Sequence, residues 1–161
     1  MVITLDYTAL QAKVERSLSV IGKRTVDDKG ERLFTDITLG SREKEIINDY
    51  FRQAVIDLAA ELTAFISAST DTSITIDLPT NHSSALDTFI TKSCEEYCVS
   101  YALASWFNVT APRLTDKYTA DCTRQIAALV RIIHDKRAPE AATSGSPVDI
   151  QTSVTTTTSN T

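Results

Sequence analysis

Three long stretches of this chain carry apolar residues at the spacing of a helix face, and this pattern excludes most folds that are not mainly helical. They span about residues 42–68, 83–107 and 112–136, and a shorter stretch of the same kind spans 8–21. Side chains three and four positions apart lie on one face of a helix, so each stretch presents an apolar stripe to a core. The longest stripe comprises Ile46, Ile47, Tyr50, Phe51, Ala54, Val55, Leu58, Leu62, Phe65 and Ile66.

The residues at the ends of these stretches support the same boundaries. Ser41 is a good N-cap for the helix that begins at about 42, and Asn81 or Ser83 suits the next one. Pro112 fits the first turn of the last long helix, whereas Pro139 forbids its continuation. Two short segments, 2–5 and 73–78, have the composition of strands, and 32–39 is a loop with a possible strand. We therefore expect a mainly α protein, a bundle of three or four helices with a small β element.

The C-terminal segment has a different composition from the rest of the chain. Residues 139–161 are nearly half Ser and Thr, and their only sizeable apolar side chains are Val148, Ile150 and Val154. So little apolar area cannot offset an ordering cost of about 1–2 kcal/mol per residue. We therefore divide the chain into a helical domain, 1–138, and an extended polar docking arm, 139–161, that orders only on a partner. An added strand on an exposed sheet edge is the bound form that its alternating aliphatic residues favour.

Charge and composition limit the possible partners. The net charge is −5 and the isoelectric point is near 5.0, which argues against a protein that grips nucleic acid. There is no apolar run long enough to cross a membrane and no signal-peptide pattern at the N-terminus, so we expect a soluble, unprocessed protein without a membrane partner. Three cysteines do not form a disulfide framework and favour a reducing intracellular setting.

The candidate chemical groups have simpler structural interpretations. Cys94, Cys98 and Cys122, with His134, could bind zinc, but the cysteines occupy stripe positions and we interpret them as packing residues. His134 precedes Asp135, yet no sharp Gly-x-Ser-x-Gly turn presents a nucleophile. No glycine-rich phosphate loop is present either. We expect no enzyme activity, no cofactor and no metal.

Charged and aromatic side chains instead indicate candidate interfaces. Lys117, Arg124 and Arg131 are spaced by seven and form one stripe on a helix, which we call the basic stripe. It is either a solvated face or a contact with an acidic helix of a neighbouring subunit, where Glu95 and Glu96 lie together with Asp87. Trp106 and Phe107 crowd the end of the same acidic helix beside the Pro112 turn, and we expect them to anchor an apolar contact.

The order of these features resembles the helical head-to-tail connector (adaptor) proteins of tailed bacteriophages. The resemblance covers about residues 41–139 and is one of layout: a capped long helix, a short strand and loop, a helix ending in Trp106-Phe107, a proline turn, a helix ending in His134 to Pro139, and a polar arm. It implies a ring, typically of twelve subunits, bound beneath the portal protein, with a C-terminal extension on the portal and a central channel for the genome.

The expected function is therefore that of a non-enzymatic virion structural protein. The resemblance implies that the ring joins the portal to a tail-side ring or tail protein in the neck of the virion, after assembly in the host cytoplasm. Genome DNA would pass through the channel without specific binding, which the acidic balance suits. The alternative is a non-viral helical interaction module, such as a scaffold or regulatory subunit, and a third class is a small hydrolase or metal enzyme.

Overall fold

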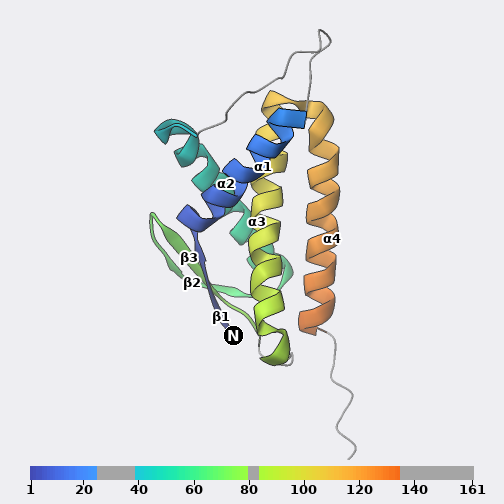
Figure 1. Ribbon diagram of the computed structural model, residues 1–161. Coiled ribbons are helices and arrows are strands. Elements are labelled where there is room, and N and C mark those ends of the chain that lie inside the picture. The colour runs from blue at the N-terminus through green and yellow to red at the C-terminus, as the bar shows by residue number, and fades with distance from the viewer. Residues whose placement is uncertain (25–38, 80–83, 135–161) are drawn as a thin grey trace, which may run out of the picture.

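The computed structural model describes residues 1–24, 39–79 and 84–134. Within these ranges the chain forms four α-helices and a three-stranded sheet; α1 and α2 contact the sheet, and α4 packs against α3 on the side away from it (Figure 1). The expected fold class, mainly α with a small β element, is confirmed. The expected arm and its residues Val148, Ile150 and Val154 lie outside the described residues, as do the possible strand at 32–38, the caps Asn81 and Ser83, Asp135 and the domain boundary at 138.

The sheet is antiparallel and brings the N-terminus beside the middle of the chain. Its strands are β1 (Val2–Asp6), β2 (Phe65–Ser69) and β3 (Ser73–Asp77), in the spatial order β1-β3-β2. Alternation places Ile3 and Leu5 of β1, with Ile74 and Ile76 of β3, on the inner face, where all four are buried. The other side chains of β1 are exposed, so the sheet has one apolar face and one face towards solvent.

The first two helices begin at local hydrogen-bonding signals. Helix α1 (Tyr7–Arg24) follows β1 directly, and Asp6 Oδ1 accepts a hydrogen bond of 2.7 Å from the Thr8 N–H at its start. Helix α2 (Ser41–Glu61) has Gly40, not the expected Ser41, at its N-cap. The Gly40 N–H donates to Glu43 Oε2 at 2.7 Å, so a side chain from inside the helix caps the backbone.

Helix α3 is the centre of the molecule. It spans Asp87–Thr110, follows a 3₁₀ turn at Ser84–Leu86, and contacts α1, α2 and α4. Helix α4 (Thr115–His134) returns alongside α3 after a second 3₁₀ turn, Pro112–Leu114, in which Pro112 occupies the first position.

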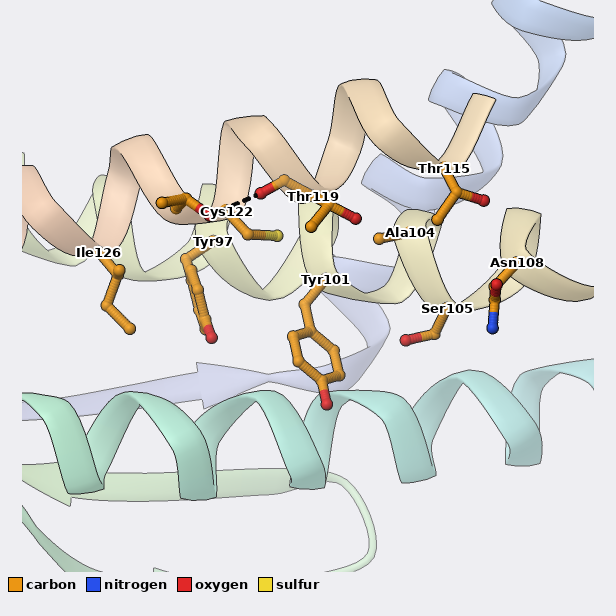
Figure 2. A pocket seen from close by; sticks show the side chains of 10 residues that line it. Tyr97, Tyr101, Ala104, Ser105, Asn108, Thr115, Thr119, Cys122 and Ile126 are labelled. Atoms are coloured by element: carbon orange, nitrogen blue, oxygen red, sulfur yellow. Dashed lines mark hydrogen bonds between the residues drawn. The ribbon is translucent and has the colours of Figure 1, made fainter. Parts of the chain in front are cut away.

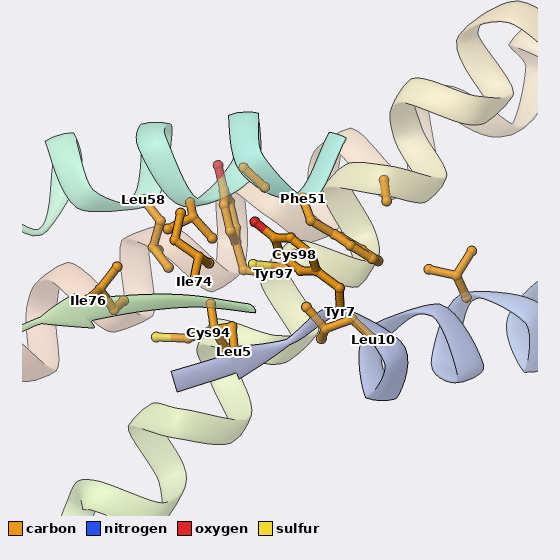
Figure 3. Packing of buried hydrophobic residues seen from close by; sticks show 14 of the residues in the cluster. Leu5, Tyr7, Leu10, Phe51, Leu58, Ile74, Ile76, Cys94, Tyr97 and Cys98 are labelled. Atoms are coloured by element: carbon orange, nitrogen blue, oxygen red, sulfur yellow. The ribbon is translucent and has the colours of Figure 1, made fainter. Parts of the chain in front are cut away.

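The core lies between the sheet and the helices (Figure 3). Tyr7 and Phe51 stack with ring centroids 5.8 Å apart, and Cys94 and Cys98 of α3 point into the same cluster, where both are buried. For these two cysteines the packing interpretation is confirmed. Cys122 of α4 is only partly buried.

The expected helix over 42–68 is wrong at its C-terminal end. Helix α2 ends at Glu61, Leu62 closes it with a bond from its N–H to Leu58 O, and Thr63 takes a left-handed backbone conformation with φ of 51°. The chain then turns into β2, where Phe65 and Ile66 pair with β3. The helical spacing of these two residues is a coincidence, because pairing with β3 overrides the local pattern.

Candidate interaction surfaces

The edge and outer face of the sheet carry the most exposed aromatic side chain in the described residues. Phe65 is 78% exposed, and its cross-strand partner Asp77 pairs on its other side with Val2, which is 64% exposed. These three residues therefore form one row across the outer face, which we call the Phe65 row. The outward side chains of β1 are all exposed, which shows that no described helix covers this face.

Strand β2 is an open edge. The order β1-β3-β2 leaves one side of β2 unpaired among the described residues, and all five of its residues are exposed. The strand reads Phe-Ile-Ser-Ala-Ser, with no charge and no proline. Proteins commonly protect such edges with lysine, proline or a covering element. Among the described residues, the one protective feature is an irregularity in the pairing with β3 between Ile66 and Ala68.

Helix α4 packs mainly against α3, and its only buried residues are Tyr118, Leu129 and Ile133. This arrangement leaves a groove on each side of α3. One groove lies between α3 and α4 on the side of α2, with a volume of about 430 Å³. The other lies between α1, α3 and α4, with a volume of about 400 Å³.

The groove on the α2 side is uncharged. Figure 2 shows Tyr101 pointing from α3 towards α2, with Tyr97, Thr119 and Cys122 along the same cleft. Burial, and then the negative charge of Asp57, raise the pKa of Tyr101, so its hydroxyl stays protonated at neutral pH. The residues that line this groove are Tyr97, Tyr101, Ala104, Ser105, Asn108, Thr115, Thr119, Cys122, Thr123 and Ile126.

The second groove contains Glu96, one of the acidic residues expected at an interface. Glu96 lies there with Lys13 and Arg16 of α1. Its neighbour Glu95 forms a hydrogen-bonded ion pair with Lys13. Glu95 therefore has a cation in its own chain, which leaves Glu96, an exposed residue, as the better candidate for a contact with another subunit.

The basic stripe faces solvent in this chain. Lys117, Arg124 and Arg131 are all exposed, Arg124 pairs with Asp121 one turn away at 2.8 Å, and the Lys117 Nζ lies 5.4 Å from the Tyr118 ring centroid. Exposed pairs of this kind contribute about 0–1 kcal/mol. The structure does not bring the stripe to Glu95 or Glu96 within one subunit, so their pairing between subunits stays a prediction.

Trp106 and Phe107, which we expected to anchor one apolar contact, lie in two different environments. Phe107 is 2% exposed and stacks on Tyr118 of α4 with centroids 5.5 Å apart. Trp106 is partly buried at the edge of the same cluster. Phe107 therefore fastens α4 to α3 inside the subunit, and Trp106 offers part of its surface to the outside.

The thiols are poorly suited to chemistry. Burial, and then the charge of Glu95, raise the pKa of Cys94 to about 12, and burial with the charge of Asp121 raises that of Cys122 to about 11. Burial likewise raises the pKa of Cys98. The thiolate, not the thiol, is the nucleophile and the metal ligand. Among the described residues, no group of three or more His, Cys, Asp or Glu side chains is arranged to hold a metal ion.

Sequence reasoning missed the Phe65 row and the two grooves. A signal for the row was present, because Phe65-Ile66 is followed by a polar Ser69 to Thr72 turn and then by an alternating strand, the order of a β-hairpin. The apolar spacing of the preceding helix concealed it. No sequence pattern predicts the two grooves, because they depend on how α4 packs against α3.

No described helix is both long and apolar enough to span a membrane. Comparison with protein-family models, with curated proteins and with solved structures finds no match to this chain.

Proposed function

We propose that this chain is a non-enzymatic structural subunit that assembles with copies of itself. The observation that carries the proposal is the open edge of β2, with Phe65 exposed beside it. A single exposed apolar residue is ordinary in a folded protein. A fully exposed, uncharged edge strand is different, because its unpaired backbone groups are a template for another strand.

The specific role we propose is that of a head-to-tail connector of a tailed bacteriophage. It rests on the resemblance of layout, with a long α2, a central α3 ending in aromatic residues, and an α4 after a proline turn. In this role the subunits form a ring in the neck of the virion, between the portal protein and a tail-side protein. The net charge of −5 suits a channel through which DNA slides without being held.

A second candidate is a helical interaction module outside any virus. The uncharged groove between α3 and α4 favours it, since about 430 Å³ lined by tyrosine, threonine and isoleucine could accept a neutral peptide. This candidate predicts a monomer or small oligomer with one bound partner. The connector predicts a large closed assembly.

Mass photometry of the purified chain, alone and mixed with a portal ring, distinguishes the two. The connector role predicts one discrete large species, near twelve times the 17.7 kDa mass of the chain for the typical ring, formed alone or on the portal. A matched pair of variants tests the surface: Phe65→Lys should prevent assembly, and Val109→Lys, at an equally exposed site at the end of α3, should not. A chain that stays monomeric with and without the portal would contradict the proposal.

A further inference from the structure

The open edge of β2 and the C-terminal arm have complementary properties. The edge offers unpaired backbone groups and no charge among its five residues. The arm contains Val148, Ile150 and Val154 at even spacing, so all three would lie on one face of a strand, and Asp149 is its only charge beyond Glu140. A strand added at a sheet edge gains main-chain hydrogen bonds, and its alternate side chains fix the register.

The position at which the chain leaves α4 is compatible with such pairing. Val2 pairs with Asp77, which pairs with Phe65, so the Phe65 row lies at the N-terminal end of β1. In Figure 1 the N-terminus and the end of α4 lie at the same end of the molecule. The thirteen residues from 135 to 147 can span roughly 45 Å when extended, more than the roughly 36 Å length of α3, the longest helix described.

The sheet and helix α4, which the arm follows in the sequence, lie on opposite flanks of the subunit (Figure 1). Helix α4 packs on α3, and in Figure 1 it stands on the other side of α3 from the sheet. A contact between two different surfaces on opposite flanks repeats from one copy to the next, and such a head-to-tail contact produces a closed ring or a filament. A neighbouring copy is therefore the partner that this placement favours.

We propose that residues 147–155 of one subunit add to the free edge of β2 in the next subunit as a fourth strand. This inference rests on the proposed self-assembly and names the segment that mediates it. It departs from the connector resemblance, which would place the C-terminal extension on the portal protein. The Val148, Ile150 and Val154 face of the arm covers the neighbour's sheet beside Phe65. The folded domain does not need the arm, because every described core residue lies at or before Ile133.

Photo-crosslinking tests the proposal directly. Phe65 is replaced by the photoreactive phenylalanine analogue p-benzoylphenylalanine, and unlabelled chains that carry it are mixed with ¹⁵N-labelled wild-type chains before illumination. The expected product joins position 65 to a ¹⁵N-labelled peptide within 147–155. The same analogue at Val109, an exposed position at the end of α3, should give no crosslink to the arm. Crosslinks to residues 25–38, only within one chain, or none at all, would overturn the proposal.

Variants of the arm supply the matched controls. Truncation after Arg137 should abolish the crosslink and leave the helical circular dichroism of the folded domain unchanged. Ile150→Lys places a charge on the aliphatic face and should lower the crosslink yield about tenfold or more, whereas Gln151→Lys, on the opposite face, should leave it within about twofold. Equal yields for the two lysine variants would show that the arm does not pair in this register and would overturn the proposal.

The outcomes separate this inference from the proposed function. If the truncated chain still forms a ring, and the full-length chain gives no crosslink from position 65 to the arm, the strand addition is refuted and the structural role stands. A crosslink to the arm in an assembly that stops at a reciprocal dimer supports the strand addition and contradicts the ring.

Discussion

Phe107 and Trp106 are neighbours in the sequence, but they have different surroundings. Phe107 is enclosed between α3 and α4 and stacks on Tyr118, whereas Trp106 is partly covered at the margin of the core. Residue size alone predicts a larger contribution from tryptophan. Burial reverses that order, because only area removed from water stabilises the fold.

Truncation of the two aromatic residues should therefore have unequal effects. Phe107→Ala leaves a cavity in the α3–α4 contact and should cost about 3–5 kcal/mol of unfolding free energy, and Trp106→Ala should cost less. Urea titration of both variants measures the difference, with Val109→Ala at an exposed site as the control. Equal losses for the two variants would contradict the placement of Phe107 in the core and Trp106 at its edge.

The thiols give the protein a dependence on alkaline pH. The pKa of Cys94 is raised to about 12 and that of Cys122 to about 11, whereas an unfolded thiol titrates near 8.5–9. The folded chain thus holds these protons more tightly than the unfolded chain. The resulting stabilisation is fully present below the unfolded pKa and is lost as the pH rises towards the folded values.

The free energy of unfolding should accordingly fall between about pH 9 and pH 11, with little change between pH 7 and pH 8. Urea titrations across this range measure it. Cys94→Ala removes one of the raised groups, so its free energy should fall less steeply with pH, even though the variant is less stable at pH 7. An identical slope in the wild type and the variant would show that Cys94 is not the source.

At the scale of elements, the sequence predicted what local spacing determines. The strand at 73–78, the N-terminal strand and all four helices were found because apolar periodicity and caps such as Pro112 act within a few residues. The end of α2 was missed because Phe65 and Ile66 continue the helical spacing, and only pairing with the distant β3 assigns them to a strand. The Phe65 row was missed for the same reason.

Thr63 lies where the chain changes from helix to strand, and substitutions at this position test its backbone conformation. A β-branched residue at a φ of 51° is strained, and its side chain is exposed, so little packing is lost when it is removed. Thr63→Gly should raise the unfolding free energy by about 0.5–1 kcal/mol. Thr63→Val keeps the strain and should give no gain. Thermal unfolding of the two variants compares them, and equal stabilities would argue for an uninterrupted helix here.

The basic stripe of α4 makes a separate prediction about assembly. Reversal of Lys117, Arg124 and Arg131 to Glu should leave the monomer helical, since all three are exposed, and should block assembly if the stripe meets an acidic face of the next subunit. Glu96→Lys is the better compensating change, because Glu95 already pairs with Lys13. Circular dichroism and mass photometry measure the two effects. Normal assembly by the triple variant would show that the basic stripe is a solvated face and not a contact between subunits.

At the scale of the whole molecule, the fold separates two kinds of surface. The inner face of the sheet and the centre of α3 form the core. No described element covers the outer face of the sheet on one flank, and α4 occupies the other flank (Figure 1). An assembly that joins the flanks would cover the open edge of β2. The protection of this edge is therefore the central claim of the proposed assembly.

Hydrogen exchange measures that protection most directly. The assembled full-length chain is compared with the chain truncated after Arg137, which we expect to stay monomeric. The amides of Phe65–Ser69 that do not bond to β3 should exchange at least about tenfold more slowly in the assembly, since new strand pairing protects them. Amides of β3, already paired on both sides, should change little. Equal exchange of the β2 amides in the two samples would contradict the account.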